Sequence, residues 1–317
     1  MTPFRSAAAA TAALAFCSFA FAQGYPSKPV HWVVPFSAGG PADIIARAIQ
    51  PKLAEQLGQP VIIANKAGGR SNIGHADVAR AEPDGHTILY VVPNIVTNPS
   101  LFRNMVDPLK ELAPVTRITS QSYVLVANKE FAPRTLADII AQAKSKPGSV
   151  SCASGGGLMT FGCEWLKTMT KADFIHVQYK GNAPAMTDLL GGQVNMLFDL
   201  FNTSLPQIRA SKIRPVALTG SKRGEPLPGV PVISETLPGF VLEGWHGIMA
   251  PVGLPGPVLD KLNQAFRVAL ADPAVAKRIT DGYSDVAPTT PEEFGGILRE
   301  DLVKYARIVK EAGIKTE

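Results

Sequence analysis

The chain has few cysteine, histidine and aromatic residues for its length, and each shortage excludes a class of function. Its 317 residues include 3 Cys and 5 His, and aromatic residues make up 7%. The five histidines show no metal-ligand spacing, so we expect no metal site and no cofactor. The net charge of +5 is spread along the chain, with no basic run flanked by aromatic side chains. We therefore expect no nucleic-acid partner.

The first residues have the pattern of a secretory signal. Arg5 precedes the apolar run SAAAATAALAFCSFAFA, which ends in A-F-A, so we expect cleavage after Ala22. The run is shorter than the about 20 residues of a membrane span, and the bulky Phe16 before Cys17 argues against a lipoprotein anchor. No other segment of the sequence is long and apolar enough to cross a bilayer. Cleavage leaves 295 residues (317 minus 22), which is enough for two lobes of an exported, soluble protein.

Maturation also removes Cys17, so only Cys152 and Cys163 remain. In an oxidising compartment two lone cysteines favour a disulfide over a catalytic pair. The bridge closes a loop of about a dozen residues and is worth about 3 kcal/mol. The alternative is two separate buried thiols.

Strand-like and helix-like segments alternate along the chain, which predicts an α/β fold. Pro51 is expected to kink or interrupt the first helix. Thr135 with Asp138 resembles a capping box. Two helices are predicted to end the chain, and Thr290, Pro291 and Glu293 mark the start of the second. Strands are predicted at 30–36, 60–66, 86–92, 123–128, 149–154, 174–181, 195–200, 214–220 and 241–251.

The order of these segments predicts two lobes, each with a mixed, mostly parallel sheet flanked by helices. The chain crosses between lobes near residue 120 and returns near 222. Loops at the carboxyl ends of the strands then face a ligand cleft between the lobes. The predicted division is residues 1–22 as signal, 23–121 and 223–317 as lobe 1, and 122–222 as lobe 2.

Sequence motifs of catalysis are missing from the chain. Ser37 and Ser154 both lack the glycine that precedes the serine in a G-x-S-x-G turn. Neither glycine loop ends in G-K-S/T, and Thr160 stands where a dinucleotide-binding loop has its third glycine. We expect no catalytic residues, and therefore a protein that is not an enzyme.

Two similar glycine-rich loops remain, PFSAGGPAD (35–43) and ASGGGLMTFG (153–162), one in each predicted lobe. Each joins a strand to a helix. Glycine allows backbone N–H groups to turn toward one point, and a helix amino end favours an anion. Either loop alone is as well explained by a tight turn. The pair favours a receptor that holds an anion between two lobes.

Four segments of the sequence resemble the Bug receptors, the periplasmic solute-binding proteins of tripartite tricarboxylate transporters. These segments are YPSKPVHWVVPFSAGGPADIIAR, PVIIANKAGGRSNIGHADVARAEPDGHTIL, NPSLFRNMVDPLKELAPVTRI and VQYKGNAPAMTDLLGGQVNMLFD. The resemblance covers essentially the whole mature chain. It implies a type II periplasmic binding protein, a monomer that closes on a small carboxylate and delivers it to membrane permease subunits. It also implies that backbone amides of both glycine loops hold the carboxylate, with bridging waters at the first.

Carried over to this chain, the resemblance assigns two groups of ligand-binding residues: Phe36, Ser37, Ala38, Gly39, Gly40 and Asp43 on the first loop, and Ser154, Gly155, Gly156, Gly157, Leu158, Met159 and Thr160 on the second.

The second loop departs from the family pattern, in which serine, threonine and asparagine are more common. Leu158 and Met159 either line an apolar wall, which favours a ligand with an aliphatic or aromatic body, or point into the lobe core. Further candidates are Asn94 in the first lobe, Asp199 and Asn202 at the ligand's distal end, and Tyr179, Lys180 and Asn182 bordering the cleft. The rival hypothesis is a secreted hydrolase or a sensory ligand-binding protein on the same fold.

Overall fold

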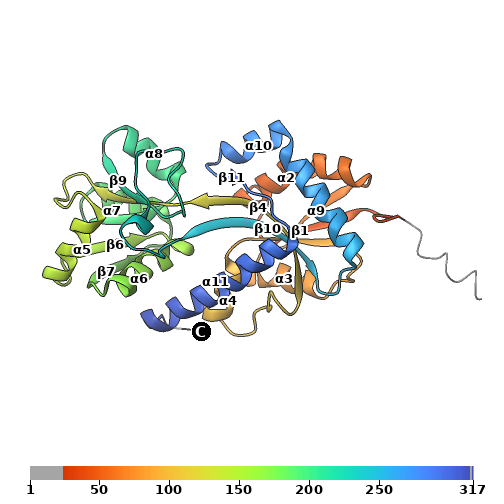
Figure 1. Cartoon of the computed structure of the whole chain (residues 1–317), viewed down its shortest axis with the longest axis horizontal. Helices are drawn as coiled ribbons and strands as arrows, with labels where there is room; N and C mark the ends of the chain where they lie inside the picture. Colours follow the sequence, from red (N-terminus) through yellow and green to blue (C-terminus); the bar gives the residue numbers. More distant parts are fainter. Residues whose placement is uncertain (1–23, 315, 317) are drawn as a thin grey trace, which may run out of the picture.

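The computed structural model describes residues 24–314 and residue 316. The predicted signal segment and its cleavage site lie outside this range. The described chain forms two α/β lobes side by side, joined by two long strands (Figure 1). Within the described residues, no helix is long and apolar enough to cross a membrane.

The lobe that holds the first glycine loop is built on a six-stranded sheet with the order β11-β4-β10-β3-β1-β2. β1 pairs in parallel with β2 and β3, whereas β10 is antiparallel to both β3 and β4. The strands are β1 (Val30–Val34), β2 (Val61–Asn65), β3 (Thr87–Val91), β4 (Leu112–Ser122), β10 (Glu243–Pro251) and β11 (Asp285–Val286).

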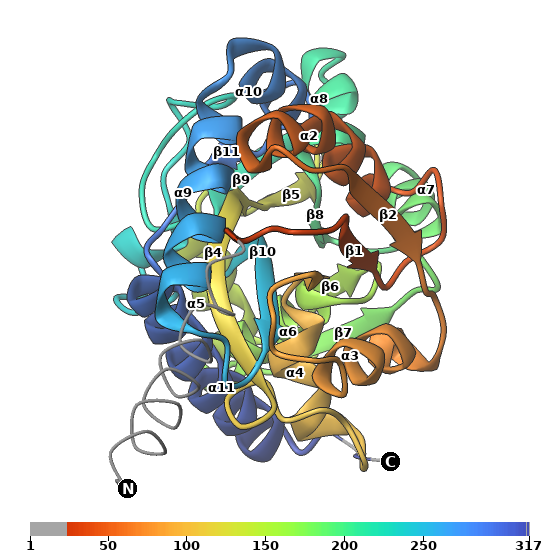
Figure 2. The ribbon, with the colours of Figure 1, turned by 90° about the vertical axis from the view of Figure 1, so that its right-hand side faces the viewer.

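Helices cover both faces of this sheet (Figure 2). One face packs its apolar side chains, Trp32 and Tyr90 among them, against α2 (Pro41–Leu57), α9 (Gly256–Ala271) and α10 (Pro273–Thr280). The other face packs against α3 (Asn72–Ala79), α4 (Asn94–Leu101) and α11 (Pro291–Ala312).

The second lobe is built on a five-stranded sheet with the order β7-β6-β8-β5-β9. β6 is parallel to β7 and β8, whereas β5 is antiparallel to β8 and β9. Its strands are β5 (Val124–Asn128), β6 (Val150–Ser154), β7 (Phe174–Gln178), β8 (Met196–Asp199) and β9 (Ile213–Leu218). The helices α5 (Leu136–Ser145) and α6 (Leu158–Thr170) cover one face, and α7 (Asn182–Leu190) and α8 (Phe201–Arg209) cover the other.

The predicted α/β fold with mixed sheets flanked by helices is confirmed. The prediction of mostly parallel sheets is wrong, because β10 and β5 each run antiparallel to both of their neighbours. The 11-residue strand β4 was not predicted, and it is one of the two strands that connect the lobes. It pairs with β10 from Glu243↔Ser122 to Pro251↔Leu112, so the two form one antiparallel ribbon under the cleft. The limits of the two lobes remain a prediction.

Of the predictions about individual helices, those of the capping boxes are confirmed and two others are wrong. The capping boxes at Thr135 and Thr290 are present. The predicted interruption at Pro51 is wrong, because α2 continues through it as one 17-residue helix whose buried face, including Ile49 and Leu53, packs on the core. A kink at Pro51 stays a prediction. Three helices follow β10 rather than two, because Asp272 accepts hydrogen bonds from Ala274 and Val275 and so begins a separate helix, α10.

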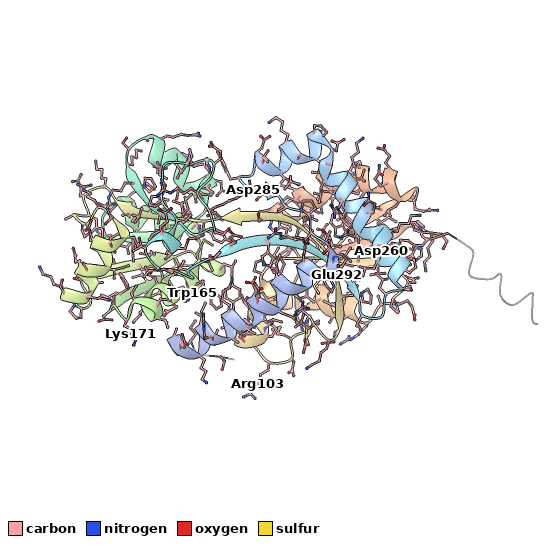
Figure 3. All side chains as sticks on the ribbon, viewed as in Figure 1. Arg103, Trp165, Lys171, Asp260, Asp285 and Glu292 are labelled. Atoms are coloured by element: carbon pink, nitrogen blue, oxygen red, sulfur yellow. A yellow bond between two sulfur atoms is a disulfide. The ribbon has the colours of Figure 1, made fainter. Side chains whose placement is uncertain are left out.

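The last helix, α11, spans the two lobes along one side of the cleft (Figure 1). Tyr305 on α11 makes an edge-on ring contact with Phe161 of α6, at 5.0 Å between ring centroids. Trp165, one turn further along α6, is labelled in Figure 3. The ammonium of Lys304 on α11 lies 5.9 Å from the centroid of its ring. A continuous apolar core therefore joins the two lobes behind the cleft.

Candidate functional site

A cavity of about 740 Å³ lies between the lobes, and the two glycine loops meet at it. Phe36 and the start of α2 contribute from one lobe, and Gly157 with the start of α6 contributes from the other. The ribbon of β4 and β10 supplies Gln121, Gly244, Trp245 and His246, and Tyr123 follows β4 directly. The remaining wall consists of Pro41, Ala42, Val92, Pro93, Asn94, Thr97, Asn98, Leu101, Phe102, Leu158, Met159, Thr160, Phe161, Gln178 and Ile314.

Three helices begin at this cavity: α2 at Pro41, α4 at Asn94 and α6 at Leu158. None of the three has a side chain that caps its N-terminal N–H groups. The first N–H groups of a helix have no partner within the helix, and the helix dipole places partial positive charge beside them. At α4 the N–H groups of Ile95 and Val96 already donate to the carbonyl oxygens of Val92 and Pro93. The uncapped amino ends of α2 and α6, which follow the two glycine loops, therefore make the site suited to an anion.

The described side chains that line the cavity include no Asp, Glu, Lys or Arg. Its ionisable side chains are neutral near pH 7. Burial lowers the pKa of His246 to about 4, and burial raises the pKa of Tyr123 to about 12. The favourable field for an anion here therefore comes from backbone dipoles, and most of the surrounding wall is aromatic or aliphatic.

The first loop is braced by Asp43, which is 2% exposed. Gly39 N–H donates to Asp43 Oδ2 at 2.8 Å, Arg47 Nε donates to the same oxygen at 2.8 Å, and Asn65 Nδ2 donates to Oδ1 at 3.0 Å. The hydrogen bond from Arg47 is the main reason that the pKa of Asp43 falls to about 2. Asp43 therefore holds the shape of the loop and does not itself line the cavity.

The second loop follows β6, and its glycines are required for two different reasons. A Cβ at Gly155 would lie 2.7 Å from the backbone nitrogen of Asn182, so there is no room for a side chain. Gly156 has φ +98° and Gly157 has φ +61°, a region that other residues rarely adopt. Nothing lies within 4 Å of a Cβ at Gly156, so a side chain there would enter open space beside the cleft.

The predicted disulfide between Cys152 and Cys163 is present and ties β6 to α6. Beside it, the Ser154 hydroxyl lies 2.8 Å from His176 Nε2, and His176 Nδ1 lies 2.6 Å from Glu164 Oε1. Ser154 also lies 3.4 Å from the hydroxyl of Thr160, which lines the cavity.

This chain of serine, histidine and carboxylate has the order of a hydrolase triad, and sequence analysis missed it. Ser154 is nevertheless completely buried, beneath the first turn of α6. The hydroxyl therefore presents no surface to the cavity, and the network braces the second loop.

The structure brings six of the sequence-predicted residues to the cavity wall: Phe36, Asn94, Gly157, Leu158, Met159 and Thr160. Leu158 meets both alternatives, because it is 8% exposed in the core and also lines the cavity. The exposed Ser37, Ala38 and Gly39 and the half-buried Gly40, Gly155 and Gly156 lie in the two loops without lining the cavity.

The other predicted residues lie further away. Asp199 is fully buried and accepts hydrogen bonds from Asn182, Thr203 and Ser204, so it braces the start of α8. The Tyr179 hydroxyl donates to Asp188 at 2.6 Å. Lys180 is exposed, and Asn202 lines a neighbouring hollow.

Most of the cavity wall that comes from β4, β10 and α4 was not predicted from the sequence. Trp245 is an example, held by a 2.8 Å hydrogen bond from its indole N–H to Asp301 of α11. The polar residue after a strand at Asn94 was the one signal in the sequence that pointed to α4.

Comparison with known proteins agrees with this arrangement. A family model described as the tripartite tricarboxylate transporter family receptor matches residues 45–314. Protein BugT of Bordetella pertussis is 32% identical, over 93% of this chain and 92% of its own length.

Two solved structures from Rhodopseudomonas palustris are also similar. MatC with bound malate is 31% identical over 90% of this chain and all of its own, with a TM-score of 0.68. A protein with adipate is 30% identical over 92% of this chain and all of its own, with a TM-score of 0.72.

Proposed function

This chain belongs to the family of tripartite tricarboxylate transporter receptors, and we propose that it captures a small aliphatic or aromatic mono- or dicarboxylate between its lobes. It then delivers the carboxylate to the membrane permease subunits of the transporter. The receptor acts in the periplasm as a monomer, after cleavage of its signal behind Ala22. It binds its ligand without converting it.

The observation that carries this proposal is the pair of uncapped helix amino ends, those of α2 and α6, at a cavity without charged side chains among the described residues. A carboxylate gains most from such a site, because backbone N–H groups hold it without the desolvation of a buried cation. The ligands of the two similar structures, malate and adipate, support a carboxylate.

The rest of the cavity supports an apolar body next to that carboxylate. Phe102, Phe161 and Met159 line it, and Met159 accepts a weak hydrogen bond from Asn182 that fixes the position of its thioether. Burying each methylene of a ligand against such a wall contributes about 0.8 kcal/mol. Citrate, with a hydroxyl and three charges on a short chain, suits this wall poorly.

Thermal unfolding of the mature protein against mono-, di- and tricarboxylates, both aliphatic and aromatic, tests the proposal. A ligand at about 100 times its dissociation constant stabilises the folded state by about 2.7 kcal/mol, which raises the midpoint by several degrees. We expect a shift with one class of acid and an unchanged ligand after incubation. A folded protein that shifts with none of the acids contradicts the carboxylate assignment.

A hydrolase is the second candidate because Ser154, His176 and Glu164 are linked in the order of a triad. The complete burial of Ser154 favours the receptor. A fluorophosphonate probe decides between them: we expect no labelling of the wild-type protein. Labelling that the Ser154→Ala variant abolishes would assign the hydrolase instead. A sensory receptor would need the same ligand site between the lobes and would differ only in the protein to which it passes the signal.

A further inference from the structure

The cleft contains a second hollow of about 420 Å³ beside the main cavity. It is bounded by α2, by the end of α10 and the segment up to β11, and by the start of α8 in the other lobe. Pro41, Gln121 and His246 line both the hollow and the main cavity. The two spaces are therefore neighbours with a shared wall, and one ligand can extend from the first into the second.

The two spaces differ in charge. The second hollow is lined by Arg278 and Asp281, both exposed, whereas the main cavity has no charged side chain among the described residues. Asp281 is paired with Lys277, whose ammonium lies 2.7 Å from Asp281 Oδ1. Within residues 24–314, the Arg278 side chain has no hydrogen bond and no ion pair. The second hollow therefore carries one cation that has no counter-ion.

The shared wall is suited to the middle of a ligand. The His246 ring is neutral near pH 7 because burial lowers its pKa to about 4, and it packs against Tyr90 at 5.5 Å between ring centroids. Its Nδ1 is buried and has no hydrogen-bond partner among the described residues. His246 therefore separates the two spaces without adding charge to either.

The opposite side of the hollow is the amino end of α8. Leu200, Phe201 and Asn202 line it, and no side chain caps the first N–H groups of this helix. Asp199, two residues before α8, is fully buried and accepts hydrogen bonds from the hydroxyl groups of Thr203 and Ser204 at 2.6 Å each. Arg278 and the start of α8 thus face one space from different lobes.

We propose that the second hollow binds the distal carboxylate of an elongated dicarboxylate, with Arg278 as its counter-ion and Asn202 at the start of α8 as its partner. This inference rests on the proposed function, which places the first carboxylate at the two glycine loops. The ligand is then an α,ω-dicarboxylate whose apolar middle lies along the main cavity and passes His246. A monocarboxylate of the same length leaves Arg278 without a partner.

Calorimetric titration of the mature protein tests the inference with matched acids, the α,ω-diacids of four to ten carbons and the monoacids of the same lengths. For the diacid that binds most tightly to the wild type, we expect Arg278→Gln to weaken binding at least tenfold, because a charge-assisted hydrogen bond is lost. Binding of the monoacids stays within twofold. Arg267→Gln is the control, since it removes the same charge from an exposed position on α9 that lines neither space.

A second variant makes the test independent of Arg278. Asn202→Asp places a negative charge at the start of α8, and we expect it to weaken the diacid at least tenfold with little effect on monoacids. Equal effects on both acids, or none on either, would overturn the distal subsite while leaving the receptor proposal intact. Failure of every acid to bind the wild type would instead overturn the receptor proposal, and this inference with it.

Discussion

The two glycine loops occupy corresponding positions in the two lobes, yet different chemistry holds each in place. The first depends on one buried carboxylate, Asp43, which connects Gly39 to Arg47 and Asn65. The second depends on a covalent bridge from Cys152 to Cys163 and on the hydrogen-bonded chain from Ser154 through His176 to Glu164.

This difference follows from the residues that each loop has in the first turn of the helix after it. Asp43 is in the first turn of α2, so one side chain can reach back to the loop and complement the helix amino end. The second loop has no acid in the first turn of α6. Its support comes from the neighbouring strand β7 and from further along α6. Equivalent backbone positions can thus be stabilised electrostatically in one lobe and covalently in the other.

The largest expected effect is a loss of ligand affinity on replacing Gly156, whose positive φ glycine adopts far more readily than other residues. Gly156→Leu places a side chain at φ +98° beside the cleft, and we expect it to weaken ligand binding more than a hundredfold. Gly239→Leu is the control, because Gly239 has a similar φ of +91° and equally open surroundings outside the cavity. Calorimetry with the ligand found in the thermal panel measures both. Equal affinity for the two variants would remove the second loop from the site.

The parts of the site that the sequence predicted are those formed by neighbouring residues. A strand followed by glycines and then a helical pattern places a loop at a strand's carboxyl end, and both loops, including Phe36 and Gly157, lie there. The disulfide also followed from local spacing, because a strand end and the next helical turn are adjacent.

The parts that were missed depend on pairings far apart in sequence. β4 and β10 pair Glu243 with Ser122, and only this register brings Tyr123 and Trp245 to one cavity. Ser154 and His176 come together because β6 and β7 lie side by side in parallel. Periodicity within a segment reports which face is buried, and it carries no information about which strand lies next to it.

Removing the covalent brace should have the second largest effect. We expect the Cys152→Ala/Cys163→Ala double variant to lose about 3 kcal/mol in the free energy of unfolding, because the unfolded chain regains the entropy of the closed loop. Denaturant unfolding of the variant and of the wild type, both without ligand, measures the difference. A loss below about 1 kcal/mol would mean that the hydrogen bonds around His176 suffice to hold this loop.

The electrostatic brace of the first loop should give the smallest effect and the one that depends on pH. Folding lowers the pKa of Asp43 from 3.8 to about 2, so the unfolded chain binds the proton more readily than the folded one. The stabilisation is then complete above about pH 4 and is lost as the pH falls toward 2.

Asp43→Asn keeps an oxygen for Gly39 but removes the charge that Arg47 faces, and we expect a loss of about 2 kcal/mol at pH 7. The difference between wild type and variant should shrink between pH 4 and pH 2 in denaturant titrations. Because Arg47 is half exposed, added salt should also reduce the difference, whereas the contribution of the disulfide should not change. A difference that is constant across pH and salt would show that Asp43 acts through its hydrogen-bond geometry and that its charge contributes nothing to the loop.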